Sequence, residues 1–321
     1  MIEVQGLCKS YGDFQALQNA SFRIEKQQGI TALLGPNGAG KTTTMRLLTG
    51  YLEPSAGEIL IDGRSVRDSR ELLEIKRRVG YLPESSPLYP EMLVSEFLEF
   101  TGRVRGLGGD ELENNAREMI EKLELGSHLY SPIGILSKGF RQRVALAATL
   151  IHKPEVIILD EPTSGLDPNQ IVHIRSLIRD LGADSTLILS THILQEVEDI
   201  CDRVIIVNRG RIVADQDTKT LRSAGEVRII ARSASGSENN QKIQASLAEA
   251  PGVQQCRTIT DIAAHAAGSV PEGYEIFVCE MEADASPEKL FAHVAAQGWE
   301  VREFAPMTRS LEEIFAELTA G

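Results

Sequence analysis

One stretch decides the fold of this 321-residue chain: Gly35-Pro36-Asn37-Gly38-Ala39-Gly40-Lys41-Thr42. It fits the pattern G-x-x-x-x-G-K-[ST] at every fixed position, and that spacing is typical of a loop that binds nucleotide phosphates. The apolar run 30–34 before it predicts a buried strand, and Met45, Leu48 and Leu52 after it recur at helical spacing. The alternative is a chance match in a glycine-rich loop, but the strand–loop–helix context that the motif requires is present.

The chemistry of this loop predicts a site for a nucleotide and for Mg²⁺. Backbone N–H groups of a glycine-rich turn converge on phosphate oxygens, and the N-terminus of the following helix adds positive partial charge. Lys41 is expected to reach the β- and γ-phosphates, and the Thr42 hydroxyl is expected to bind Mg²⁺. We count Thr43, the next residue, among the expected nucleotide contacts.

Composition limits the class of protein. The chain is 42% hydrophobic and 25% charged, as in ordinary globular proteins, and its length favours about two domains. Its net charge of −13 argues against a general nucleic-acid binder, which needs Lys and Arg to replace phosphate counterions. No signal-peptide pattern is visible and apolar runs such as 204–207 are too short to span a bilayer, so we expect a cytoplasmic protein. The cysteines lack metal-site spacing, and neither a metal nor a disulfide is expected at Cys8, Cys201, Cys256 and Cys279.

Residues 1 to about 221 alternate strand-like and helix-like patterns, which predicts an α/β domain. The runs 156–159 and 186–190 read as buried parallel strands. Between about residues 86 and 152 the strand signals fade, and three helical patterns predict a helical subdomain inserted into the α/β core.

The pattern changes after about residue 222. Polar, Gly- and Ser-rich segments flank a short strand at 226–232, and the order of elements up to residue 304 is β-α-β-β-α-β. This order predicts a small α+β ferredoxin-like module, which a final helix at 310–318 follows. The module contains no catalytic cluster, so we expect a regulatory or dimer-stabilising role, with a small-ligand sensor as the alternative.

A second chemical motif is an apolar strand that ends in Asp160 and Glu161. An acidic residue at the end of a strand beside a phosphate loop is where Mg²⁺ is held, usually through water, and Asp160 suits that role. Glu161 is expected on the other side of the strand, free to orient or deprotonate an attacking water. By itself, a strand that ends in two carboxylates is often only a solvated strand end. The phosphate loop in the same chain favours the functional interpretation.

Over about residues 2 to 220 the motifs resemble the ATP-binding subunit of an ABC transporter. The segment Leu136-Ser137-Lys138-Gly139-Phe140-Arg141-Gln142-Arg143 resembles the signature of that family, and Ser164-Gly165-Leu166-Asp167 resembles the loop that meets the partner subunit. His192 falls where the family places its switch histidine, and Tyr11 falls where an aromatic ring stacks on adenine. The resemblance implies a P-loop NTPase fold of the ABC cassette type, with a mixed-sheet core and a helical subdomain.

The resemblance also implies that two copies of the chain build each ATP site. Ser137 and the N–H of Gly139 would then contact the γ-phosphate held by the opposite copy, with Asp167 near the contact between the copies. His192 would contact the γ-phosphate within its own copy. The alternatives are a plain helix N-cap for Ser137, an ordinary surface or core residue for His192, and a core position for Tyr11.

Two residues depart from the family pattern. Glu84 follows Tyr81-Leu82-Pro83 where the family usually has glutamine; a glutamate can bind Mg²⁺ but cannot donate a hydrogen bond. Lys138 stands where a glycine is usual, and its side chain either faces the γ-phosphate or extends into solvent. Both departures, together with the ending 310–319, resemble the export-type branch whose membrane subunits are of the ABC-2 kind, which includes gliding-motility-type and drug-resistance-type ATPases.

The resemblance therefore implies an ATPase that dimerises around ATP and Mg²⁺ and powers a separate membrane permease in export. We expect it to lie on the inner face of the cell membrane through that permease and to bind no nucleic acid. The permease is expected to dock near residues 84–99, unless the apolar side chains there cover the protein's own helices; these are Leu88, Tyr89, Met92 and Leu93. Two other functions remain open: a soluble ABC ATPase that acts on the ribosome or nucleic acid, and a cassette that regulates without hydrolysis.

Overall fold

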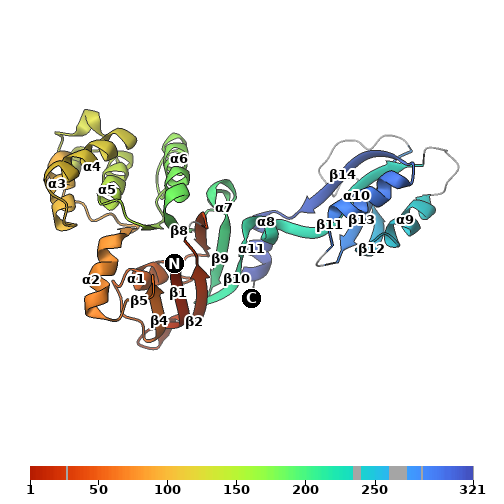
Figure 1. Ribbon diagram of the computed structural model, residues 1–321, viewed down its shortest axis with the longest axis horizontal. Helices are drawn as coiled ribbons and strands as arrows, with labels where there is room; N and C mark the ends of the chain where they lie inside the picture. Colours follow the sequence, from red (N-terminus) through yellow and green to blue (C-terminus); the bar gives the residue numbers. More distant parts are fainter. Residues whose placement is uncertain (27, 234–239, 260–272, 283–284, 321) are drawn as a thin grey trace. The chain divides into compact units, whose positions relative to one another are not determined.

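The computed structural model describes residues 1–26, 28–233, 240–259, 273–282 and 285–320. The chain forms two compact units (Figure 1). The first contains Met1–Thr218 with Phe315–Gly321, and the second contains Lys219–Ile314.

Two sheets form the framework of the first unit. A four-stranded antiparallel sheet has the order β2-β1-β4-β5, and a six-stranded sheet has the order β10-β9-β3-β8-β7-β6. In the six-stranded sheet only the edge pair of β10 and β9 is antiparallel. The strands are β1 (Ile2–Tyr11), β2 (Phe14–Ile24), β3 (Ile30–Leu34), β4 (Ala56–Ile61), β5 (Arg64–Ser65), β6 (Val79–Leu82), β7 (Val156–Asp160), β8 (Thr186–Thr191), β9 (Arg203–Asn208) and β10 (Arg211–Asp217).

The centre of the six-stranded sheet is apolar on both faces. Every residue of β3, β7 and β8 is buried, as expected for parallel strands covered on both sides. One cluster of buried side chains joins Ile2 of β1, Met45 of the first helix and Ile158 of β7, so that both sheets share a core. The predicted mixed-sheet cassette core is confirmed.

Helices cover the six-stranded sheet and form the helical subdomain, whose members α3, α4 and α5 gather at one end of the first unit (Figure 1). The first helix ends at Leu48, earlier than the apolar pattern up to Leu52 suggests, because Gly50 adopts a left-handed φ of 63°. Leu52 packs against the core from outside the helix. The helices of this unit are α1 (Lys41–Leu48), α2 (Ser69–Arg78), α3 (Val94–Val104), α4 (Gly109–Lys122), α5 (Lys138–Leu150), α6 (Pro168–Asp184) and α7 (Leu194–Ile200).

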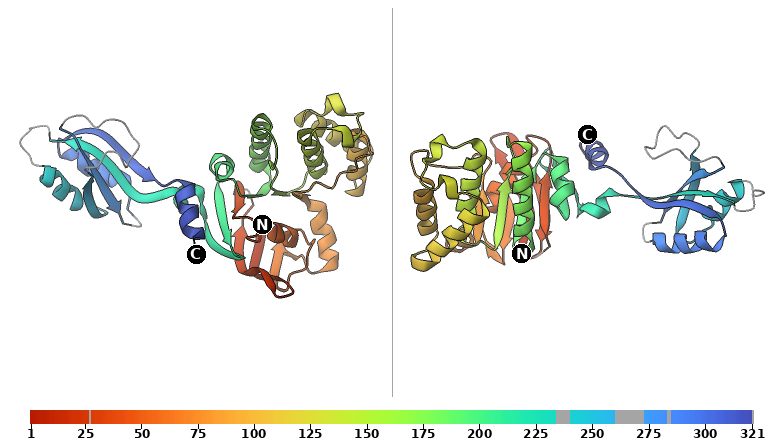
Figure 2. Two further views of the ribbon diagram at one scale, coloured as in Figure 1. Left: turned by 180° about the vertical axis from the view of Figure 1, so that it is seen from behind. Right: turned by 90° about the horizontal axis from the view of Figure 1, so that it is seen from above.

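The second unit contains a four-stranded antiparallel sheet of order β12-β13-β11-β14. Its elements follow the predicted order: β11 (Ser223–Arg232), α9 (Asn240–Ala248), β12 (Val253–Ile259), β13 (Glu275–Met281), α10 (Pro287–Ala296) and β14 (Glu300–Thr308). Both helices pack on one face of this sheet (Figure 2), and Leu247 and Leu290 belong to one buried cluster with Phe277. The predicted ferredoxin-like module is confirmed. In the sequence, α8 (Thr218–Arg222) precedes it and α11 (Leu311–Thr319) follows it, and the residues of α11 from Phe315 on belong to the first unit.

No helix in the described ranges is both long and apolar enough to cross a bilayer.

Candidate nucleotide-binding site

Three neighbouring parallel strands position the residues that the sequence singled out. In the sheet, β3 lies next to β8 and β8 lies next to β7. The loop 35–40 follows β3, Glu161 follows β7 and His192 follows β8. Because the carboxyl ends of parallel strands share one edge of a sheet, the structure brings the loop, both carboxylates and the histidine together.

The loop lies against the backbone of two strands. A Cβ on Gly35 would lie 2.3 Å from the carbonyl oxygen of Val207 in β9, and a Cβ on Gly40 would lie 2.6 Å from that of Ala16 in β2. Gly40 also has a φ of 109°, which side-chain-bearing residues rarely adopt. These two glycines are therefore required by the close approach of the loop to its neighbours.

Lys41 folds back over this loop. Its ammonium Nζ donates to the carbonyl oxygens of Gly35 (2.8 Å) and Pro36 (3.3 Å), and it lies 3.7 Å from Glu161 Oε1. Burial lowers the pKa of Lys41, and the carboxylates of Glu161, Asp160 and Glu84 oppose that shift. The ammonium is thus held at the centre of the acidic residues, within reach of an anion placed on the loop.

Asp160 is fully buried at the end of β7. Its Oδ1 accepts a hydrogen bond from the Ser190 hydroxyl, whereas its buried Oδ2 has no hydrogen-bond partner in the part of the chain that the structure describes. Burial raises the pKa of Asp160, and the hydroxyls of Ser190 and Thr42 act in the opposite direction. An unpaired carboxylate oxygen next to a threonine hydroxyl is a donor set that fits Mg²⁺.

Glu161 turns toward the loop immediately after β7. Its φ of 49° is left-handed, which costs a side-chain-bearing residue roughly 1–2 kcal/mol. Hydrogen bonds from its N–H to Ser190 O and from Ser164 N–H to its carbonyl (both 3.1 Å) hold this conformation. Its Oε1 lies 3.1 Å from His192 Nδ1, so the carboxylate, Lys41 and His192 form one cluster.

The signature segment begins α5. Ser137 is its N-cap, and the exposed Ser137 hydroxyl oxygen accepts a hydrogen bond from Phe140 N–H (3.3 Å). Gly139 is buried against the Gln170 side chain, because a Cβ there would lie 2.4 Å from the Gln170 amide group. Asp167 caps α6 by accepting from Gln170 N–H (3.0 Å).

Lys138 contacts the loop that precedes α6. A Cβ on Gly165 would lie 1.9 Å from Lys138 Nζ, so the ammonium rests directly on this glycine. The sequence left its direction open between the γ-phosphate and solvent. In the structure Lys138 is solvent-exposed, and its ammonium lies against Gly165 of the same chain.

Tyr11 and Glu84 lie at the margins of the site. Tyr11 ends β1 with 45% of its surface exposed, and Lys9 Nζ lies 5.3 Å from its ring centre, so it is not a core residue. Glu84 is exposed beyond the end of β6, and its charge acts on Lys41.

Sequence reasoning gave no role to Gln142 or Ser190, yet both contact the segments that carry the predicted residues. Gln142 is buried; its Nε2 donates to Pro162 O (2.8 Å) and its Oε1 accepts from the Ser86 hydroxyl (3.3 Å). It therefore connects α5 to the segments that follow Glu161 and Glu84. A polar residue within the apolar strand β8 was the available signal for Ser190, which bonds Asp160.

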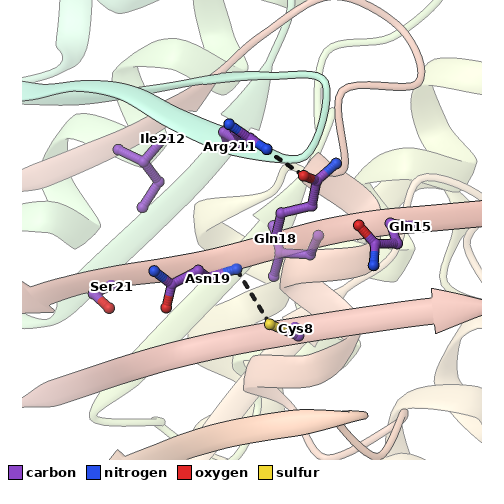
Figure 3. Close-up of a pocket in the computed structure, with 8 residues that line it drawn as sticks. Cys8, Gln15, Gln18, Asn19, Ser21, Arg211 and Ile212 are labelled. Carbon is purple, nitrogen blue, oxygen red and sulfur yellow. Dashed lines mark hydrogen bonds between the residues drawn. The ribbon is translucent and has the colours of Figure 1, made fainter.

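A cavity of about 740 Å³ lies elsewhere in the first unit and contains none of the predicted nucleotide ligands. Arg211 Nε donates to Gln18 Oε1 (3.0 Å), and Asn19 N–H donates to Cys8 Sγ (3.2 Å) (Figure 3). The cavity belongs to β1, β2 and β10; its lining consists of Cys8, Gln15, Leu17, Gln18, Asn19, Ser21, Arg211 and Ile212.

Comparison with known proteins identifies the family. Residues 17–164 match the family model described as ABC transporter. The chain is 32% identical over 318 residues to the uncharacterized ABC transporter ATP-binding protein YxlF of Bacillus subtilis strain 168, and the match covers 99% of each chain. The chain is an ABC transporter ATP-binding protein. The cassette is also 37% identical over 223 residues to the daunorubicin resistance ATP-binding protein DrrA3 of Streptomyces coeruleorubidus, which covers 69% of this chain and 70% of that protein.

Solved structures agree with this assignment. The cassette resembles the dimeric structure of MJ0796, a bacterial ABC transporter cassette, with a TM-score of 0.63 and 26% identity over 68% of this chain and 98% of that one. The dimeric post-hydrolysis state of MJ0796 bound to ADP and Pi gives a TM-score of 0.62 with the same identity and coverage. The predicted family and fold are therefore confirmed, and the chain is the ATP-binding subunit of an ABC transporter.

Proposed function

We propose that this cassette hydrolyses ATP in a site built by two copies of the chain, and that the cycle drives a separate membrane permease. The observation that carries the proposal is the cluster of Lys41, Glu161 and His192 beside the buried Asp160. The dimeric MJ0796 structures, one of them with ADP and Pi, support the same arrangement.

ATP would bind along the loop. The free backbone N–H groups of the loop would face phosphate oxygens; Pro36 has no N–H, and that of Ala39 donates to Pro36 O (3.1 Å). The Lys41 ammonium would exchange its two carbonyl partners for the β- and γ-phosphates. Thr42, Asp160 and Glu84 are the residues that would hold Mg²⁺, which neutralises phosphate charge when bound. The exposed ring of Tyr11 is available to stack on adenine.

Glu161 is the proposed general base. A water oxygen attacks the γ-phosphorus, the bond to the ADP oxygen breaks, and Glu161 takes the proton that the water loses. His192 Nδ1, 3.1 Å from Glu161 Oε1, keeps the carboxylate directed at the water. As an imidazolium, with a proton on each ring nitrogen, His192 would also donate to the γ-phosphate. Lys41 stabilises the charge on the transferred group.

The second copy would complete the site. Ser137 is exposed at the N-terminus of the 13-residue helix α5, where backbone N–H groups favour an anion. Gly139 adds an N–H without a side chain that would keep the phosphate away, and Asp167 fixes the neighbouring loop. Two copies of the chain would thus form two sites.

Replacing Glu161 by glutamine tests the proposal. Glu161→Gln should bind ATP but hydrolyse it about 10² to 10⁴ times more slowly, because a glutamine cannot accept the proton. Glu118→Gln is the matched control, since Glu118 pairs with Lys122 and Lys153 on another surface. Wild-type turnover by Glu161→Gln would refute the base assignment, and absence of turnover in the wild type would favour the non-hydrolysing alternative.

We further propose that the permease docks on residues 84–99 and that transport is export. The second point is supported by the name of a relative, the Nod factor export ATP-binding protein I of Ralstonia nicotianae, which is 36% identical to this chain over 215 residues. Tyr89 is 47% exposed, and its ring lies 6.0 Å from that of the exposed Phe100. Aspartate at Tyr89 or Met92 should abolish copurification with the permease, whereas Leu73→Asp, at an exposed apolar residue of α2, should not. Unchanged copurification of both variants would refute this docking surface.

The C-terminal module, residues 222–321 in the proposed division, is assigned a regulatory or dimer-stabilising role. It has its own hydrophobic core beneath α9 and α10, separate from the core of the cassette domain. Because this core is independent of the cassette core, the role is testable by deletion, although deletion of residues 222–321 also removes Phe315–Gly321, which belong to the first unit.

A further inference from the structure

A buried carboxylate lies behind the proposed catalytic pair. Glu196 of α7 is only 1% exposed. Burial of a charged group is unfavourable unless its oxygens are paired. Both oxygens of Glu196 accept a hydrogen bond: Thr163 Oγ1 donates to Oε1, and Thr191 Oγ1 donates to Oε2 at 2.6 Å. The guanidinium of Arg175, 3.9 Å from Oε1, supplies the opposite charge.

The two threonines belong to the two segments that carry the proposed catalytic pair. Thr163 lies two residues after Glu161, and Thr191 immediately precedes His192. Thr191 Oγ1 also accepts a hydrogen bond from Ile193 N–H (3.0 Å), so one hydroxyl fixes the backbone on both sides of His192. A single carboxylate therefore connects the end of β7 to the end of β8.

This connection matters because neither segment is held by regular structure at the residue that acts. Glu161 stands in a left-handed conformation, which persists only where its surroundings enforce it. His192 lies between β8 and α7, with 44% of its side chain exposed. Catalytic groups need a supporting shell that holds them to within a fraction of an ångström.

We propose that Glu196 is a positioning residue that sets the 3.1 Å separation of Glu161 and His192 by holding Thr163 and Thr191. The inference rests on the proposed hydrolytic function of Glu161. It predicts that loss of either threonine hydroxyl lowers kcat and leaves ATP binding by the loop intact. A purely structural role predicts a loss of stability alone.

The threonines are better probes than Glu196, because a replacement at Glu196 removes both connections at once, whereas each threonine variant removes one hydrogen bond and has a serine variant that restores it. Thr→Val at 163 or 191 removes the hydroxyl at nearly constant shape. Thr→Ser retains the hydroxyl and loses only the methyl group. Thr149→Val is the matched control, since Thr149 is equally buried but bonds only Ala145 O within α5.

The experiment measures steady-state hydrolysis of Mg-ATP and the melting temperature of the full-length chain. Thr163→Val and Thr191→Val should lower kcat by between about tenfold and a hundredfold, because displacement of a catalytic group by about 1 Å has such an effect. Their KM for ATP should stay within about twofold of the wild type, as expected for a residue that does not bind substrate. Both serine variants should restore kcat, and Thr149→Val should retain it.

Three results would overturn the inference: wild-type kcat in both valine variants, an equal loss in Thr149→Val, or no recovery with serine. ATP hydrolysis by the wild type separates failure of the proposed role of Glu196 from failure of the proposed hydrolytic function. If the wild type hydrolyses ATP and the valine variants do too, only the role of Glu196 fails. If the wild type does not hydrolyse ATP, the proposed function fails and the inference fails with it.

Discussion

Gln142 offers a sharp test of how the site is held together. Its side-chain amide connects Pro162 O, on the segment after Glu161, to the Ser86 hydroxyl, on the segment after Glu84. Gln142→Leu keeps the approximate volume of the side chain and removes both hydrogen bonds. The change should therefore loosen two segments of the site from α5 without creating a large cavity.

The structure sets the size of the effect on stability. Pro162 O loses the donor that Gln142 provides at 2.8 Å, whereas the half-buried Ser86 hydroxyl can turn to water. Leaving one buried carbonyl without its partner costs about 1–3 kcal/mol. In a domain of this size each kcal/mol lowers the melting temperature by about 2–4 °C, so we expect a fall of roughly 2–12 °C.

Asn115→Leu is the control that separates stability from function. Asn115 is also buried, and its Nδ2 donates to Ile151 O (3.0 Å) within the helical subdomain, where it connects no segment of the site. Both variants should melt earlier by similar amounts in scanning calorimetry. Only Gln142→Leu should lose kcat, by about tenfold or more, at an unchanged Kd for ATP. Equal kcat values for Gln142→Leu and Asn115→Leu would show that the hydrogen bonds of Gln142 do not hold the site in place.

Three further predictions concern charge, pH and domain roles. Asp160→Asn should raise the melting temperature of the nucleotide-free protein at pH 7, because burial raises the pKa of Asp160 and disfavours its ionised form. The same variant should lose the rise in melting temperature that Mg-ATP causes in the wild type. An unchanged rise with Mg-ATP would contradict the proposed role of Asp160 in holding Mg²⁺. Burial beside Arg105 lowers the pKa of His152 from 6.5 to about 4, so its stabilising contribution is present above pH 6.5 and is lost as the pH falls toward 4. In denaturant titrations at pH values between 4 and 7, the free energy of unfolding of His152→Gln should fall on the order of 2–3 kcal/mol less than that of the wild type as the pH is lowered. The same pH dependence of the unfolding free energy in both proteins would contradict this prediction. Deletion of residues 222–321 should alter dimer stability or coupling while ATP binding persists in calorimetry, whereas complete loss of ATP affinity would contradict the separation of roles.

Local patterns were sufficient where neighbouring residues define the structure. The phosphate loop was predicted from its spacing, and the apolar runs predicted β7 and β8. Three helical patterns predicted α3, α4 and α5, and the order of elements predicted the C-terminal module. In each case the signal lies within a short window of the sequence.

Contacts between distant segments could not be predicted in the same way. No periodicity indicates that Glu196 meets Thr163 or that Gln142 meets Pro162, because these pairs form only after the strands assemble. The contact of the Lys138 ammonium with Gly165 likewise forms only in the tertiary structure, so the sequence alone did not predict it. The early end of α1 depends on the left-handed conformation of Gly50, which competes with the apolar pattern up to Leu52.

If a second copy of the chain completes each ATP site, the molar mass of the Glu161→Gln variant in solution should depend on Mg-ATP. Light scattering with and without saturating Mg-ATP would compare this variant with the double variant Glu161→Gln/Ser137→Arg. We predict that Mg-ATP converts the 35.1 kDa chain of Glu161→Gln to a dimer, and that the double variant binds ATP but remains a monomer. A Glu161→Gln chain that stays monomeric in Mg-ATP, or a double variant that dimerises equally well, would show that Ser137 of a second copy does not complete the site.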